Sequence, residues 1–221
     1  MSGEGNVGVY AQGMSYIFNH IGNSSEIKIG KDGVGLYLVG TGTANINSKI
    51  ELSESDKGTT IGVYSDGNSN VLFGIGSILN IGKGAVGLYS LDASKFNNTF
   101  KIKTGEKLVV SLGENSALAL LSGNTNSSIS LKSFLNNNAN DKIEIDSFGS
   151  GASLFYVKDG SKAVLDENYN ITTGGLNSTS VLVGTGSGSK VEISSGKTLK
   201  TNTHVGLVAT DSSTAENSGI L

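Results

Sequence analysis

The sequence predicts an all-β protein built as a parallel β-helix, or β-solenoid, of about eight coils of roughly 25–30 residues. Three observations predict this fold. One short segment recurs along the chain at a nearly constant period. Strand-forming residues occur in short runs separated by turn residues, and the 221 residues include no proline.

The recurring segment is clearest at Ile27–Tyr37 (IKIGKDGVGLY) and again at Leu79–Tyr89 (LNIGKGAVGLY). Each copy is a short alternating strand, a glycine-rich corner and a second apolar strand that ends in tyrosine. Periods of about 20–50 residues are typical of solenoids, propellers and repeat arrays. The central residue of the second strand can be followed at intervals of 27, 27, 25, 30, 36, 28 and 25 residues through Val9, Leu36, Val63, Leu88, Leu118, Leu154, Leu182 and Leu207.

The strand content of each repeat favours a solenoid over a propeller. Val, Ile, Thr and Tyr occur in short runs between Gly, Asn, Asp and Ser, which is the pattern of strands joined by turns. A repeat of about 27 residues has room for two or three short strands, whereas a propeller blade needs four strands and about 40 residues. We expect inward-facing Ile, Val and Leu to stack on their counterparts one coil away, so that stability comes from contacts between neighbouring coils.

Composition fits this fold and limits the possible partners. Proline cannot donate a backbone hydrogen bond to a neighbouring coil, so its absence suits a continuous ladder. The chain has no cysteine, and its 16 basic residues are all lysines scattered among 19 acidic ones, giving a net charge of −3. Without a basic stripe we expect no nucleic-acid partner. No apolar run approaches the roughly 20 residues of a membrane helix, so we expect no membrane insertion by this segment.

We expect residues 1–221 to form a single β-helical repeat segment, taken from a longer protein. No signal peptide is visible, and neither end resembles the polar capping repeat that closes a solenoid. The longest interval between repeats contains Asn136–Asp141, which reads NNNAND. We interpret residues 136–141 as a loop insertion and a candidate contact feature, since loops on rigid scaffolds often carry function.

Several motif-like strings are interpreted as structural. Gly82–Gly87 matches GxGxxG, but an apolar strand follows instead of the helix that a dinucleotide site requires. Ser195–Thr198 resembles the end of a P-loop, yet position 191 is valine where the first glycine should be. His20 and His204 are the only histidines and have no acidic neighbours at ligand spacing, so we interpret both as loop residues. We therefore expect no catalytic, cofactor-binding or metal-binding residues and no cofactor.

One pair of carboxylates leaves an alternative open. Glu144 and Asp146 should point to the same side of one strand, roughly 7 Å apart. Glycoside hydrolases use carboxylate pairs about 5–9.5 Å apart. We interpret the pair as part of an outward polar face beside Lys142.

The recurring (A/G)VG(L/I/V)Y segment, as in Ala85–Tyr89 and Ile61–Tyr64, resembles the passenger region of large type V autotransporter adhesins, most closely the fusobacterial type. The scarcity of proline and cysteine and the bias toward Asn, Lys, Gly and Ser are also similar. The resemblance implies a right-handed β-helix displayed at the cell surface and exported through the outer membrane by a C-terminal translocator barrel. This chain contains neither that barrel nor a signal peptide, and the family supplies no catalytic motif to transfer.

The resemblance implies a non-enzymatic role in adhesion or as a structural stalk. The expected location is the cell surface, with anchoring in the outer membrane through the missing barrel. The expected partner is a protein or glycan on a host or bacterial surface. The alternative is a β-helical carbohydrate-active enzyme, either a glycoside hydrolase or lyase-like. An enzyme should bring Asp and Glu from adjacent coils together in one groove, whereas an adhesive segment should disperse them.

Overall fold

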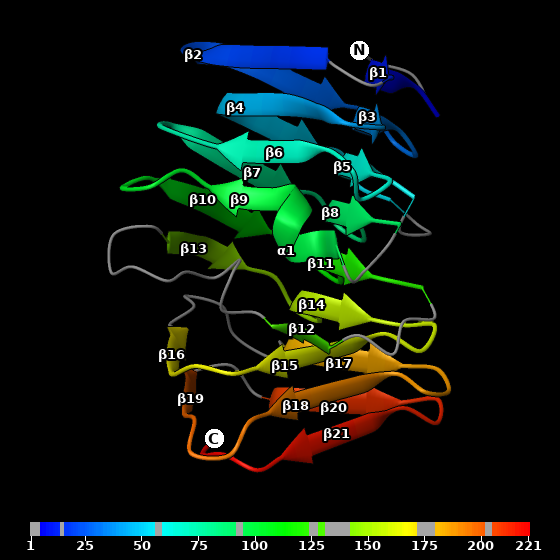
Figure 1. Cartoon of the computed structure of the whole chain (residues 1–221), viewed down its shortest axis with the longest axis vertical. Coiled ribbons are helices and arrows are strands. Elements are labelled where there is room, and N and C mark those ends of the chain that lie inside the picture. The colour runs from blue at the N-terminus through cyan, green and yellow to red at the C-terminus, as the bar shows by residue number, and fades with distance from the viewer. Residues whose placement is uncertain are drawn as a thin grey trace.

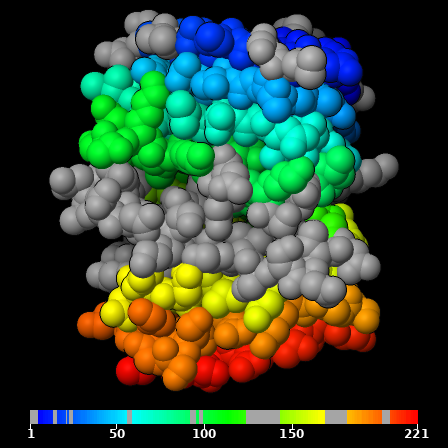
Figure 2. All heavy atoms as spheres, viewed as in Figure 1, coloured from blue at the N-terminus to red at the C-terminus, as the bar shows by residue number. Residues whose placement is uncertain are grey.

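The computed structural model confirms a solenoid of parallel strands, stacked turn upon turn along one axis (Figure 1). It describes residues 5–13, 16–55, 59–91, 95–123, 128–130, 142–171, 180–201 and 205–221. Successive stretches of the chain lie as successive layers, and the space-filling view shows them as bands of colour from one end to the other (Figure 2). The N-terminal layers and the C-terminal layers therefore lie at opposite ends of the stack.

The second strand of every repeat belongs to one parallel eight-stranded sheet, here called face 1. Each strand pairs with the equivalent strand one turn away, so the sheet order follows the chain order. Its members are β1 (Val7–Gln12), β3 (Val34–Val39), β5 (Ile61–Ser65), β8 (Val86–Ser90), β11 (Ala117–Leu121), β14 (Ser153–Val157), β17 (Ser180–Thr185) and β20 (Val205–Thr210).

The remaining strands form the other two sides of the turns, here called faces 2 and 3. In the N-terminal turns, the long strands β2 (Tyr16–Ile29) and β4 (Gly42–Leu52) run along both of these faces. One part of β4 pairs with a strand of face 2 and another part with a strand of face 3. Face 2 then has β6 (Asn70–Phe73) and β9 (Phe100–Ile102), and face 3 has β7 (Ser77–Ile81), β10 (Lys107–Leu112) and β13 (Lys142–Phe148).

The C-terminal turns have separate sheets on these two faces. One is four-stranded and the other is two-stranded. The first contains β12 (Ser128–Ser130), β15 (Lys162–Leu165), β18 (Lys190–Ile193) and β21 (Thr214–Asn217), and the second contains β16 (Tyr169–Ile171) and β19 (Leu199–Thr201).

The solenoid makes about six turns, slightly fewer than the eight coils that the repeats predict. Eight repeats do supply eight strands to face 1, but β1 and β20 are its edge strands. A repeat at either end has a neighbour on one side only. The number of repeats is therefore larger than the number of turns that have a neighbouring turn on both sides.

The inward stack on face 1 corrects two positions of the predicted series. Leu88 pairs with Ala119, and Ala119 pairs with Phe155, which pairs with Leu182. The predicted positions Leu118 and Leu154 were each wrong by one residue. Both are still buried, because they occupy the position that glycine holds in the earlier repeats. The stack consists of Val9, Leu36, Val63, Leu88, Ala119, Phe155, Leu182 and Leu207.

Glycine precedes the stacked residue in the first four repeats because the turns there pack closely. A methyl group added at Gly35 would lie 2.5 Å from the carbonyl oxygen of Gly62. One added at Gly62 would lie 2.6 Å from the carbonyl oxygen of Gly87. Real Cβ contacts are longer than this, so only glycine fits without a backbone shift. The turn that contains β11 accommodates Leu118 at the equivalent position.

A cluster of buried phenylalanines lies where faces 2 and 3 change from one sheet to another. The single helical turn α1 (Phe96–Thr99) precedes β9, and its Phe96 is fully buried. The ring centroid of Phe96 lies 4.9 Å from that of Phe100 and 6.2 Å from that of Phe155 in β14. Of the described strands, only those of face 1 pair without interruption along the whole stack. The three rings therefore join turns whose described strands do not pair on face 2, although they pair on faces 1 and 3.

Lysines bridge carboxylates on neighbouring turns. Lys49 Nζ lies 2.8 Å from Glu26 one turn away and also contacts Glu51, two residues along its own strand. Lys190 similarly contacts Glu192 at 3.0 Å and Glu216 one turn away. Between β2 and β4 opposite charges lie directly across from each other, Glu26 from Lys49 and Lys28 from Glu51, which favours this register.

We expect the Glu26 pair to make the protein lose stability on acidification. Hydrogen bonds from Lys49 lower the pKa of Glu26 to about 2, with a further contribution from Lys28. Because this pKa is lower in the folded chain than in the unfolded one, the stabilisation is present above pH ~4.5 and is lost as pH falls toward ~2. Melting temperatures measured between pH 7 and 2 should fall less steeply for Glu26→Gln than for the wild type. Glu114→Gln, at a carboxylate salt-bridged to Lys83, is the control and should keep the wild-type slope.

Candidate binding surface

The outer side of face 1 has a column of tyrosines at matching positions of successive turns. Tyr10 pairs with Tyr37, Tyr37 with Tyr64, and Tyr64 with Tyr89. The first three rings stack, with centroids 5.4 and 4.4 Å apart and interplanar angles of 19° and 15°. The Tyr89 ring is turned by 74° from that of Tyr64. The parallel stack therefore ends at Tyr89.

The column packs closely enough to change the acidity of a phenol. Partial burial raises the pKa of Tyr64 to about 12, and a hydrogen bond with Tyr37 contributes. The pKa of Tyr64 thus favours the neutral phenol over the phenolate. The hydroxyl group of Tyr64 is therefore both a donor and an acceptor at physiological pH.

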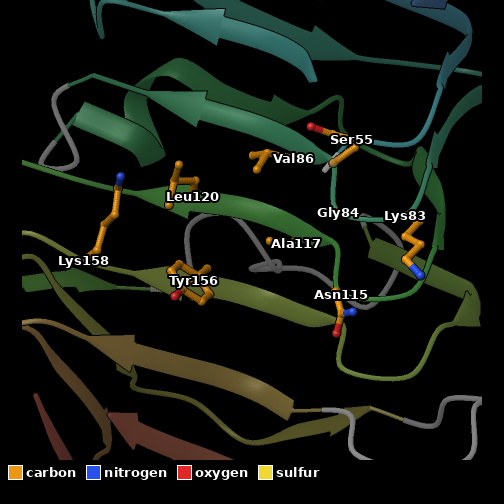
Figure 3. A pocket seen from close by; sticks show the side chains of 10 residues that line it. Ser55, Lys83, Gly84, Val86, Asn115, Ala117, Leu120, Tyr156 and Lys158 are labelled. Carbon is orange, nitrogen blue, oxygen red and sulfur yellow. The ribbon is translucent and has the colours of Figure 1, made fainter. Parts of the chain in front are cut away.

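A groove lies on face 1 beyond the end of the stacked tyrosines. Leu120 follows Tyr89 in the column and Tyr156 follows Leu120, while Ala117 follows Val86 in the neighbouring column. Leucine and alanine are smaller than the tyrosine and valine that precede them, so the surface is hollowed there. The groove has a volume of about 500 Å³ and is lined by Ser55, Lys83, Gly84, Ala85, Val86, Asn115, Ala117, Leu120, Tyr156 and Lys158 (Figure 3).

Figure 3 shows the layout of the groove: Val86, Ala117 and Leu120 lie in its middle, and Lys83 and Lys158 lie at opposite ends. Val86 and Ala117 form its floor and are each 7% exposed. The two lysines are far more exposed, at 55% for Lys83 and 41% for Lys158. The groove therefore combines an apolar floor with a cation at each end.

Each of these lysines has one acidic neighbour that is not part of the groove lining. Lys83 Nζ lies 3.0 Å from Glu114 Oε2, and Lys158 Nζ lies 3.7 Å from Asp159 Oδ2. Asp159 also accepts a hydrogen bond of 2.6 Å from Ser122. Exposed pairs of this kind are worth about 0–1 kcal/mol, so a ligand can draw either lysine away at little cost.

A second, shallower groove lies on face 3 and has a volume of about 370 Å³. It crosses β4, β7, β10 and β13. Glu51 is the one carboxylate in its lining, which consists of Glu51, Leu52, Asn80, Ile81, Gly82, Ser111, Leu112, Gly113 and Ser147. Neither groove has two carboxylates in its lining.

The GxGxxG string is a corner between two strands, as predicted. Gly84 has a φ of 66°, and the amide of Ala85 donates to the carbonyl of Gly82 at 3.1 Å. Strand β8 follows directly, in the place of a helix. Ser195–Thr198 is likewise a turn, in which the amide of Lys197 donates to the carbonyl of Ser194 at 3.1 Å.

The interpretation of His20 as a loop residue was wrong, because His20 lies within β2. Its ring stacks on Phe18 with centroids 6.2 Å apart, and Nδ1 contacts the hydroxyl of the buried Ser48 one turn away. Partial burial lowers the pKa of His20. His204 and the predicted loop at residues 136–141 lie outside the described residues.

The two carboxylates of the possible hydrolase pair have separate partners. Glu144 Oε2 accepts a hydrogen bond from Lys107 Nζ at 2.8 Å, and Asp146 Oδ2 accepts one from Ser111 at 3.2 Å. A register shift in the pairing of β10 with β13 falls at Asp146, which has no partner in the register. An ideal strand would place the two carboxylates on one side, but this irregularity interrupts the strict alternation.

The described part of the chain has no group of three or more His, Cys, Asp or Glu residues placed to hold a metal ion. No helix among the described residues is long and apolar enough to cross a membrane.

Sequence reasoning did not identify the groove on face 1. The signal was the change along two outward columns, from tyrosine to Leu120 and from valine to Ala117. Detecting this change requires the correct register, and the predicted series was shifted by one residue at Leu118.

Comparison of the chain with known protein families, curated proteins and solved structures gives no match, so the function is argued below from its residues and geometry.

Proposed function

We propose that this chain is a non-enzymatic β-solenoid segment that acts as an adhesive surface or structural stalk, as in autotransporter passengers. The observation that carries the proposal is the dispersal of the described carboxylates. Several of them face lysines of neighbouring turns, as Glu26 faces Lys49 and Glu144 faces Lys107, and others accept hydrogen bonds from backbone amides or hydroxyls. A charge neutralised in this way supports the stack and is poorly placed to act as a catalytic acid or base.

The continuous outer sheet supports the same proposal. Face 1 has eight parallel strands and displays aromatic and aliphatic side chains at regular intervals of about 4.8 Å. Solenoids of this kind offer long surfaces for extended contacts. The location that fits such a role is the cell surface.

Bead attachment tests the adhesive part of the proposal. Beads coated with the 221-residue chain should attach to cultured epithelial cells or to other bacteria more often than beads coated with heat-unfolded chain. If the beads attach to none of the surfaces tested, the adhesive role is excluded and only the stalk role remains. That role predicts only that the folded chain holds its ends apart at a fixed length, which small-angle scattering measures.

The enzyme alternative makes a different prediction. A hydrolase should release reducing ends from a polysaccharide, and replacing its carboxylate pair should abolish the release. We expect the wild-type chain to release none from a panel of neutral and acidic polysaccharides. Release that disappears in the double variant Glu144→Gln, Asp146→Asn would overturn the non-enzymatic proposal.

A further inference from the structure

We propose that the groove over β8, β11 and β14 binds an acidic oligosaccharide, with Lys83 and Lys158 contacting its negatively charged groups. This inference rests on the adhesive role proposed above and names its ligand. The groove volume of about 500 Å³ is in the range of small-molecule sites, about 300–1,000 Å³. It extends over strands of three neighbouring turns, with Lys83 and Lys158 at its two ends (Figure 3).

The backbone around the groove favours a glycan over an extended peptide. Peptides often bind a sheet by adding a strand to its free edge. Strands β8, β11 and β14 are each paired on both sides within face 1, so they offer no such edge. A ligand here has to be recognised by side chains alone.

The side chains of the groove match the two kinds of surface that a sugar presents. Val86, Ala117 and Leu120 form an apolar floor against which the C–H groups of a sugar ring can pack. The ring of Tyr156 adds a large surface with a polar hydroxyl at its end. Asn115 places an amide in the lining, where sugar hydroxyls would lie, whereas the hydroxyl of the buried Ser55 already bonds Asp32 and Thr59.

The charges of the groove indicate an acidic sugar. The lining contains two lysines and no carboxylate. Because Lys83 and Lys158 lie at opposite ends, one ligand can place an acidic group at either end while its rings cover the floor (Figure 3). Glu114 and Asp159 lie beside these lysines and oppose an anion, which limits affinity and favours a ligand that also contacts the floor.

Isothermal titration of the full chain tests the site with defined probes. The probes are 3′-sialyllactose and trigalacturonate as acidic glycans, lactose as the neutral counterpart, and a hexaglutamate peptide as an acidic ligand without sugar rings. We expect at least one acidic glycan to bind at least tenfold more tightly than lactose and hexaglutamate. No binding of either acidic glycan, or equal binding of hexaglutamate, would overturn the proposal.

Two groove variants and one matched control locate the binding. The double variant Lys83→Gln, Lys158→Gln should weaken acidic-glycan binding at least tenfold, and Ala117→Phe should block it by filling the floor. Lys107→Gln is the control, because Lys107 is 53% exposed and salt-bridged like Lys83 but does not line the groove. It should change affinity less than twofold. Equal weakening in Lys107→Gln, or wild-type affinity in the double lysine variant, would place binding elsewhere.

The bead assay separates this inference from the proposed function. Attachment that persists in the double lysine variant overturns the groove as the adhesive site but leaves the adhesive role intact. Attachment that is lost in the double lysine variant supports both the groove as the adhesive site and the adhesive role, when circular dichroism shows that the variant and the wild type have the same fold.

Discussion

Replacing Phe155 with alanine should lower the free energy of unfolding by about 3–5 kcal/mol, the range for removing a buried phenylalanine. Phe155 is fully buried in β14 and contacts Phe96, which lies before β9 in an earlier turn. On face 2, β9 and β12 belong to different sheets, whereas β10 and β13 of face 3 pair with each other. A cavity at Phe155 would therefore weaken the stack where the described strands of face 2 do not pair.

Urea unfolding followed by circular dichroism measures this effect. Tyr156→Ala is the matched control, since Tyr156 is the next residue of the same strand and lies in the outer groove. Its loss should cost well under half as much. The Phe155→Ala transition should also broaden or split, because a solenoid is stabilised by nearest-neighbour contacts and can unfold in parts. A single transition with a loss below about 1 kcal/mol would show that strand pairing on faces 1 and 3 holds these turns together without the Phe155 side chain.

The fold was predictable from sequence because its signal is repeated. Ile27–Tyr37 and Leu79–Tyr89 share strand, corner and strand, and that likeness is enough to predict parallel stacking. Local irregularities were not predictable in the same way. Both Leu118 and Ala119 are apolar and buried, so the sequence does not distinguish which of them continues the stack. The structure resolves this through the pairing of Ala119 with Leu88.

The candidate site was less predictable than the fold. The groove depends on how outward residues of three separate turns align, and a shift of one residue reverses which side chains face outward. Glu144 and Asp146 show the same limit. Ideal strand geometry predicts that they face the same side, but it does not predict that Lys107 and Ser111 of β10 hydrogen-bond to them.

Replacing Gly87 with alanine should lower the free energy of unfolding by about 1–3 kcal/mol or more, the cost of overpacking a core. A methyl group at Gly87 would lie 2.6 Å from Ile81 Cδ1 and 2.8 Å from the carbonyl oxygen of Leu118. The isoleucine side chain can rotate, but the Leu118 carbonyl belongs to the next strand of face 1. Relieving the clash therefore requires the two turns to separate.

Gly184→Ala provides the matched control, because Gly184 also lies in a strand of face 1 but has more space. Its added methyl group would lie 3.4 Å from the Ser213 hydroxyl oxygen, which is an ordinary contact. Alanine also restricts the unfolded chain more than glycine does, so this control should be neutral or stabilising by up to about 1 kcal/mol. If both variants unfolded at the same urea concentration, close packing between turns would not be what requires glycine at position 87. The backbone conformation, and not close packing, would then require the glycine of the repeat. The presence of Leu118 and Leu154 at the equivalent positions would need a different explanation.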